Sequence, residues 1–172
     1  TWEVKDDYEH LKDGSKRGAT VAIRYTAEGS ELHNDMMVHH TATVPERFYM
    51  TDGEDMYKGV GMSACLYLQI GSGELLLRSS DPQVQPHLNY NYFKEEEDLR
   101  RMRECVRLCA EVGDGTSYEE IVTRRIQPTE QELKDNDLLD LWILKNATTS
   151  HHISGTCKMG LESDPMAVVN QN

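Results

Sequence analysis

Long hydrophobic runs are missing from this sequence of 172 residues. No apolar stretch approaches the roughly 20 residues that a helix needs to cross a bilayer. The first residues also lack the basic-then-apolar pattern of a secretory signal. We therefore expect no membrane-spanning segment, and the cytoplasm is the expected location.

Basic residues are scarce relative to acidic ones. The chain has 18 lysines and arginines against 30 aspartates and glutamates, which gives a formal net charge of −12. A surface of this sign repels the phosphates of nucleic acids and of anionic lipids. Neither a nucleic acid nor a membrane is therefore an expected partner.

Cysteine is also sparse, with four residues at Cys65, Cys105, Cys109 and Cys157 and no Cys-x-x-Cys pair. Four cysteines are too few for a disulfide-built scaffold of this length, so a reducing compartment is expected. Cys105 and Cys109 share one face of a predicted helix and would suit a metal only if two further ligands converged there. Packed thiols are the favoured interpretation, and no metal site is expected.

A glycine-rich dinucleotide-binding turn is absent as well. Gly59-Val60-Gly61 lacks the third glycine, the preceding strand and the following helix of that fingerprint, and we interpret it as a loop. Such a turn seats a pyrophosphate at a helix amino terminus within a strand-helix-strand unit. This chain therefore has no predicted seat for a dinucleotide.

Short strands are predicted where apolar and polar residues alternate. They fall at 21–25, 36–43, 64–70, 75–77 and 87–92. Gly71-Ser72-Gly73 predicts a hairpin between the third and fourth of them. The connections are too short for parallel crossovers, so the sheet should be largely antiparallel.

Helices are predicted at 94–112 and 129–146. The first has apolar residues every three or four positions, acidic residues at its start, and Gly113 in place to end it in a left-handed conformation. The second opens with a capping box formed by Thr129 and Glu132. The predicted fold class is α+β, with a largely antiparallel sheet packed against helices.

Two adjacent histidines, His151 and His152, are the candidate chemical groups. Imidazole has a reference pKa of roughly 6.5, so it can accept a proton from a substrate near neutral pH. Neighbouring residues of a strand point to opposite faces, so only one of the two would face a given site. From the pair alone, packed or surface histidines before a Gly-Thr turn are the favoured interpretation.

The residues that follow the pair carry a family resemblance. His152, Gly155, Thr156 and the run Lys158-Met159-Gly160, with Ala167-Val168-Val169 behind them, resemble the histidine motif of the glucose-methanol-choline (GMC) flavoprotein oxidoreductases. A second block resembles the substrate-domain signature of that family. It comprises Gly73-Glu74-Leu75-Leu76-Leu77-Arg78-Ser79-Ser80-Asp81-Pro82, then Pro86 and Asn91-Tyr92-Phe93.

The resemblance implies an FAD-dependent oxidoreductase that oxidises an alcohol to a carbonyl by hydride transfer to the flavin. Residues 1–146 would form the substrate domain, and 147–172 would begin the carboxy-terminal return toward the flavin domain. By the resemblance, His152 is the catalytic base and His151 a possible pocket or orienting residue. FAD would be held mainly outside this chain by a dinucleotide-binding flavin domain, covalently linked or separate, and the substrate would be a small alcohol.

Two departures from the family pattern leave alternatives open. Asn170 stands where the family commonly has aspartate, and the second catalytic histidine or asparagine is expected beyond the residues of this sequence. One alternative is a flavin-containing hydroxynitrile lyase of the same fold. The other is a nonenzymatic interaction module derived from that fold.

Overall fold

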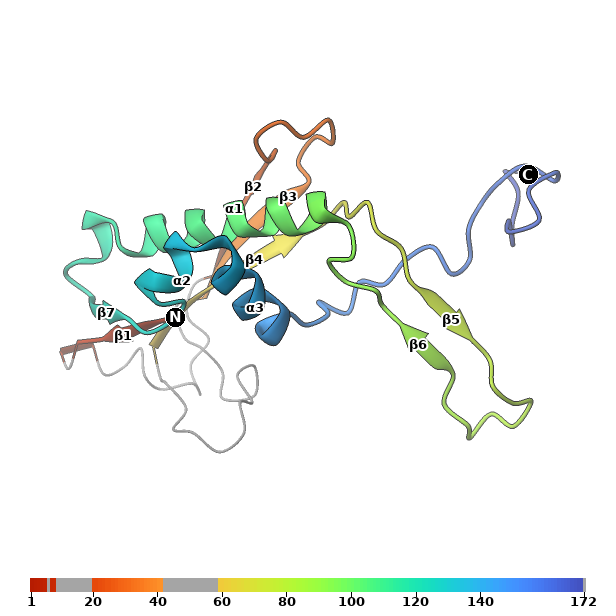
Figure 1. The fold of residues 1–172 in the computed structure, drawn as a ribbon, viewed down its shortest axis with the longest axis horizontal. Coiled ribbons are helices and arrows are strands. Elements are labelled where there is room, and N and C mark those ends of the chain that lie inside the picture. The colour runs from red at the N-terminus through yellow and green to blue at the C-terminus, as the bar shows by residue number, and fades with distance from the viewer. Residues whose placement is uncertain (6, 9–19, 42–58, 172) are drawn as a thin grey trace. The chain divides into compact units, whose positions relative to one another are not determined.

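The structure is a computed structural model, described here for residues 1–5, 7–8, 20–41 and 59–171 (Figure 1). The chain divides into two compact units. Unit 1 comprises Thr1–Ser72 and Tyr92–Lys145, and unit 2 comprises Gly73–Asn91 and Asn146–Asn172. The hairpin region 73–91 thus groups with the carboxy-terminal segment, although the functional boundary predicted near residue 146 stays a prediction.

Five strands of unit 1 form one sheet in the order β2-β3-β4-β1-β7. All neighbouring strands in this sheet are antiparallel. The strands are β1 (Trp2–Val4), β2 (Thr20–Tyr25), β3 (Met36–Thr41), β4 (Gly59–Leu66) and β7 (Val122–Arg125). The prediction of an antiparallel α+β fold is therefore confirmed.

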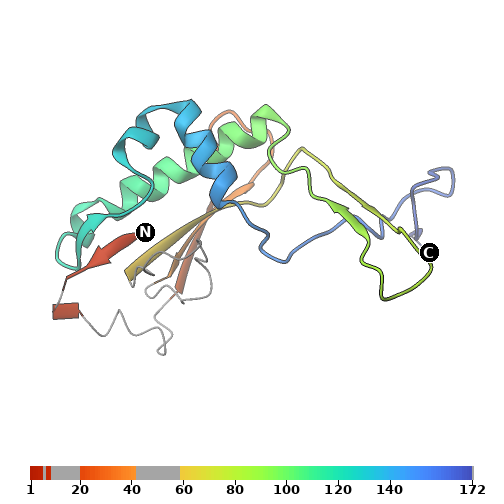
Figure 2. The ribbon, with the colours of Figure 1, turned by 60° about the horizontal axis from the view of Figure 1, so that its bottom comes forward.

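The long helix α1 (Glu96–Gly113) covers one face of this sheet, as Figure 2 shows. Its first turn carries Glu96, Glu97 and Asp98, whose negative charges complement the helix dipole. The predicted left-handed ending at Gly113 is wrong, because the helix includes Gly113. A Cβ at this position would collide with the Trp2 ring, so glycine serves close packing here.

The core of unit 1 lies on two sides of α1. Toward the sheet, Cys105 and Cys109 pack with Ala27, Met36 and Val38. Toward the helix α3 (Asn136–Asn146), a second cluster contains Leu99, Met102, Val106, Leu139 and Ile143. Burying one such aliphatic side chain contributes about 1.5–3 kcal/mol, so α1 joins two layers that would otherwise expose apolar surface.

The single helix predicted from Thr129 to Asn146 is wrong, because the chain forms two helices here. They are α2 (Glu130–Lys134) and α3 (Asn136–Asn146). The predicted capping box of Thr129 and Glu132 is confirmed at the start of α2. Asp135 breaks the helix with extended backbone angles, and its Oδ1 accepts the N–H of Asp137 at 2.9 Å to restart it. None of the helices among the described residues has the length and apolar character to span a membrane.

The predicted hairpin through Gly71-Ser72-Gly73 is also wrong. The strand that follows, β5 (Glu74–Leu76), pairs with β6 (His87–Asn89) rather than with β4. The two glycines instead permit close approaches, since the Gly71 N–H donates to the Asp98 carboxylate at 2.9 Å. A Cβ on Gly73 would meet the backbone of Asn89 and Tyr90.

The interpretation of Gly59-Val60-Gly61 as a loop is likewise wrong. These residues begin β4, where Gly59 pairs with Glu3 and Gly61 pairs with Thr41. β4 bridges β1 and β3 at this point, so the glycine dipeptide belongs to the centre of the sheet. The conclusion that it forms no dinucleotide-binding turn is unaffected.

A buried ion-pair network ties α1 to one end of the sheet, where the β2–β3 turn lies beside the exit from β4. The Arg101 guanidinium has no exposed surface and donates to Asp35 at 2.7 Å, to Asp98 at 2.5 Å and to the Leu68 carbonyl at 3.0 Å. Both carboxylates accept further hydrogen bonds, Asp35 from Ala27 N–H and Ser30 Oγ, and Asp98 from Ile70 N–H and Gly71 N–H. The network fixes the β2–β3 turn and the exit from β4 against one helix.

Candidate functional site

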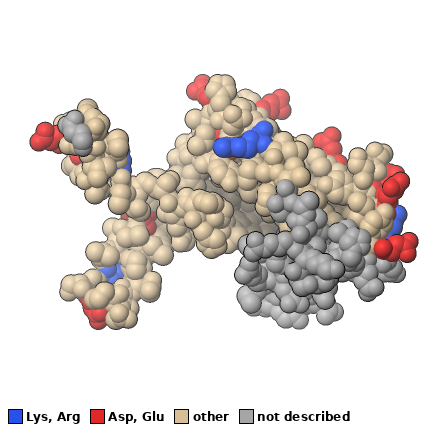
Figure 3. Space-filling view, turned by 180° about the vertical axis from the view of Figure 1, so that it is seen from behind, with Lys and Arg blue, Asp and Glu red and all other residues tan. Residues whose placement is uncertain are grey.

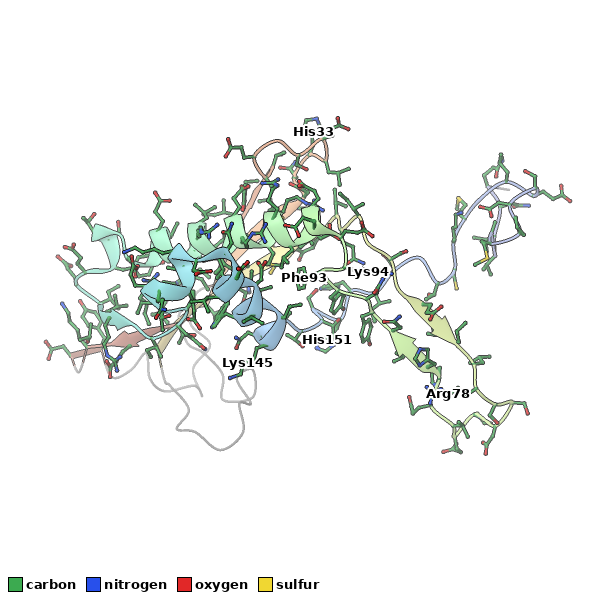
Figure 4. The ribbon with its side chains drawn as sticks, viewed as in Figure 1. His33, Arg78, Phe93, Lys94, Lys145 and His151 are labelled. Carbon is green, nitrogen blue, oxygen red and sulfur yellow. The ribbon has the colours of Figure 1, made fainter. Side chains whose placement is uncertain are left out.

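The predicted site lies on the segment that leaves α3 and contains neither helix nor strand from residue 147 to 157. Figure 4 labels His151 on this segment. His151 has a φ of 65°, and its N–H donates to Thr149 Oγ1 at 3.0 Å. The strand geometry assumed for the two histidines is therefore wrong, and the turn at His151 separates them instead.

His152 is exposed, as are its neighbours from Ile153 to Cys157. Within the described part of the chain, no hydrogen bond or ion pair engages its imidazole. As far as the described residues go, both ring nitrogens are open to a group from outside them. Gly155 follows with a φ of 91°, a backbone conformation that glycine adopts at little cost.

The rest of the histidine motif begins a closed loop. The Gly160 N–H donates to the Val169 carbonyl at 3.0 Å, and the Val168 N–H donates to the Lys158 carbonyl at 2.8 Å. Met159 and Val169 thus lie side by side in a short parallel bridge. The Ala-Val-Val run named in the sequence motif supplies the backbone groups that close this loop.

The second sequence block forms the β5–β6 hairpin of unit 2. Arg78 Nη2 lies 2.9 Å from His87 Nδ1, and His87 Nε2 lies 4.0 Å from Glu74 Oε1. At the turn, the Asp81 N–H donates to Ser79 Oγ at 3.0 Å. This explains the Ser-x-Asp-Pro pattern as turn chemistry, since the serine and aspartate side chains bond to nearby backbone N–H groups.

Unit 2 lacks a hydrophobic interior of its own. None of its described residues is buried, although it contains many large apolar side chains. Those most exposed to solvent are Leu75, Leu76, Leu77, Val84, Leu88, Ile153, Met159, Leu161, Met166, Val168 and Val169. Figure 3 shows the described surface of this unit as mostly uncharged, with a few isolated charged groups. Exposed apolar surface of this extent is typical of an interaction site.

The described residues offer no seat for a dinucleotide cofactor. Their strand ladders are all antiparallel, and no glycine-rich turn joins a strand to a helix amino terminus. They also contain no cluster of three or more side chains suited to a metal ion. Cys105 and Cys109 are buried free thiols, as the packed-thiol interpretation predicts.

Unit 1 contains a separate apolar cavity of about 310 Å³. His40 lines it, and its ring lies 5.7 Å from the Tyr118 ring. Burial, with a smaller contribution from neighbouring His39, lowers the pKa of His40 below its ordinary value. The other lining side chains are Val21, Ile23, Val38, Met62 and Val112.

Comparison with known proteins identifies the family. The family model described as GMC oxidoreductase matches residues 70–172, which include both sequence blocks. The chain belongs to the GMC oxidoreductase family. FAD is named for a solved protein of similar fold, in agreement with the flavin that the motifs imply.

Two bacterial relatives of this GMC oxidoreductase chain are oxygen-dependent choline dehydrogenases. That of Rhizobium rhizogenes is 34% identical over 121 residues, covering 69% of this chain and 22% of the relative. That of Rhizobium etli CIAT 652 is 38% identical over 98 residues, covering 57% and 18%. Formate oxidase of Aspergillus oryzae has a similar fold, with a TM-score of 0.63 and 22% identity over 73% of this chain and 22% of that one. The chain thus spans about a fifth of the length of these relatives.

The Asp35–Arg101–Asp98 network is the polar feature that sequence reasoning missed. Asp98 and Arg101 lie among the apolar positions of α1, where Leu99, Met102 and Cys105 mark the buried face. A charged residue within the apolar stripe of a helix is a sequence signal for a buried polar network. The pattern does not reveal a partner such as Asp35, because that residue lies 66 positions away in sequence.

Proposed function

We propose that this chain is the substrate-binding and catalytic-base portion of an FAD-dependent oxidoreductase that oxidises an alcohol to a carbonyl. The observation that carries the proposal is the exposed imidazole of His152 within the family's histidine motif, which no described residue engages by a hydrogen bond or ion pair. An imidazole in this state can accept the hydroxyl proton of an alcohol held within hydrogen-bond reach. A flavin held by the other part of the enzyme would supply the redox chemistry.

The composition of unit 2 supports a flavin-binding partner segment. Its exposed leucines, valines and methionines are unfavourable in water and cannot be buried by the unit itself. The relatives extend well beyond the region matched here, so they contain chain that this sequence does not cover. We assign the covering surface to that remaining part, on the same polypeptide or on a separate chain.

His151 has a different role in this proposal. Its left-handed backbone and its bond to Thr149 make it a turn residue that presents the following imidazole. Its own side chain is exposed and, in this proposal, would border the site where the alcohol binds. The two histidines thus provide a matched pair, in which one substitution should affect proton transfer and the other should not.

The test uses the flavoprotein that contains this chain together with its flavin-binding part. Choline is the first alcohol to try, because it appears in the names of the bacterial relatives. Anaerobic mixing with the alcohol should bleach the flavin absorbance. His152→Ala should slow this bleaching by about 10²–10⁴-fold, the usual contribution of a general base, at unchanged flavin content.

His151→Ala is the matched control and should change the bleaching rate only by a few-fold. Equal effects of the two substitutions would contradict the assignment of the base to His152. A flavin that no alcohol bleaches, in a protein that cleaves cyanohydrins, would favour a lyase. A protein without either activity would favour an interaction module.

A further inference from the structure

The loop formed by residues 158–169 is closed by one ion pair as well as by backbone hydrogen bonds. Lys158 Nζ donates to Asp164 Oδ2 at 2.6 Å. The other oxygen of the same carboxylate accepts the Met166 N–H at 2.9 Å, and the Ala167 N–H donates to the Asp164 carbonyl at 3.0 Å. Asp164 therefore links the start of the loop at Lys158 to its returning residues Met166 and Ala167.

Gly160 is fitted to this ion pair. A Cβ at Gly160 would lie 3.0 Å from the Ala167 Cβ and 3.1 Å from Asp164 Oδ2. A side chain larger than glycine at position 160, or larger than alanine at position 167, would push the Asp164 carboxylate away from Lys158. The lysine and the glycine of the histidine motif, together with the first residue of Ala167-Val168-Val169, thus serve one compact loop.

This ion pair contributes little to the free energy of folding. The side chains of Lys158 and Asp164 are 54% and 29% exposed, and a pair at such a surface contributes only about 0–1 kcal/mol. The apolar side chains of the loop point away from it into solvent. The loop therefore has no hydrophobic core, and its conformation depends on local hydrogen bonds and on the ion pair.

The loop lies close to the proposed base in the chain. Only residues 153–157 separate His152 from Lys158, and these residues contain neither helix nor strand and are exposed. α3 lies at the other end of the segment, ending at Asn146. The position of the His152 imidazole thus depends on α3 on one side and on the 158–169 loop on the other.

We propose that the Lys158–Asp164 ion pair is a positioning device for His152. It holds the loop in one conformation, the loop docks by its outward apolar side chains on the flavin-binding part, and this docking fixes the imidazole. The inference rests on the proposed function, because it takes His152 as the base. Lys158 and Asp164 themselves touch no substrate in this scheme.

The test compares Lys158→Met, Asp164→Asn, the double variant and Lys158→Arg in the complete flavoprotein. Each neutral variant should lower kcat about tenfold or more through misplacement of the base, with flavin content unchanged. The double variant should be no slower than either single variant, because both remove the same interaction. Lys158→Arg should restore most of kcat, since arginine keeps the charge and the reach.

Lys145→Met is the matched control, because Lys145 is an exposed lysine at the end of α3. It should leave kcat unchanged. A second measurement follows the loop itself by hydrogen–deuterium exchange, in which the Gly160 and Val168 amides should exchange faster in Lys158→Met than in the parent. The positioning role would be overturned if Lys158→Met kept the same kcat as Lys145→Met. It would also be overturned if the losses of kcat in the two single variants added up in the double variant.

The two proposals fail in distinguishable ways. Full turnover in His152→Ala refutes the proposed function, whatever the loop does. Full turnover in Lys158→Met, combined with an inactive His152→Ala protein, refutes the positioning role alone.

Discussion

Replacement of Arg101 by methionine should sharply destabilise unit 1. Arg101 and Asp35 have no exposed side-chain surface, and Asp98 is 3% exposed. Methionine fills much of the same space but leaves two buried carboxylates without their cation. Breaking a buried pair in this way costs about 3–5 kcal/mol, because the remaining charge is uncompensated.

The remaining hydrogen-bond donors to the two carboxylates reduce this cost without removing it. Asp35 keeps Ala27 N–H and Ser30 Oγ, and Asp98 keeps the N–H groups of Ile70 and Gly71. We therefore expect a loss of about 4 kcal/mol, near the middle of the usual range. With a urea m-value of about 2 kcal/mol/M, the unfolding midpoint should fall by about 2 M.

Tryptophan fluorescence during urea unfolding is the assay, because both tryptophans, Trp2 and Trp142, lie in unit 1. The control is the triple variant Arg101→Met, Asp35→Asn, Asp98→Asn. It removes the two uncompensated charges and keeps oxygen acceptors, so it should recover more than half of the lost stability. A loss below about 1 kcal/mol in Arg101→Met, or a triple variant no more stable than it, would refute the reasoning.

Two further predictions concern acid and thiol chemistry. Burial acts to raise the pKa of Asp35, but hydrogen bonds from Ser30, Arg101 and Ala27 outweigh it and lower the pKa below 3.8. Its carboxylate therefore stabilises unit 1 above that pH, and the urea midpoint should fall as the pH drops from about 5 to 3, less steeply in Asp35→Asn. With a chromogenic disulfide reagent at pH 8, exposed Cys157 should react first, whereas burial raises the pKa of Cys65 to about 11 and should make it slow. Equal rates for the two thiols in Cys65→Ser and Cys157→Ser would contradict this order.

Sequence patterns predicted the elements that local periodicity governs. The alternation around Val21 identified β2, although Val21 and Ile23 themselves are exposed among the described residues. The three- and four-residue spacing around Met102 identified α1 because one face of this helix is buried. The capping box at Thr129 was readable because both of its partners lie within three residues. Antiparallel pairing followed from the short connections.

The errors arise where distant residues decide the structure. Gly71 forms no hairpin turn because the Asp98 carboxylate, 27 positions away, binds its N–H. Gly113 meets the Trp2 ring, which no local pattern around the helix reveals. At the candidate site, the motif indicated His152 as the base. The left-handed turn at His151 depends on the hydrogen bond that its N–H donates to Thr149 Oγ1, which strand periodicity does not predict.

The pairing of β5 with β6 has a consequence for how the chain tolerates change. Glu74 lies opposite Asn89, so the chain leaves unit 1 after Ser72 and re-enters it at Tyr92 through two adjacent strands. Residues 77–86 at the hairpin tip can therefore lengthen or shorten while the strand ends stay in place. Because loop-closure free energy changes little with added residues, the tip can vary in length without disturbing the core around α1.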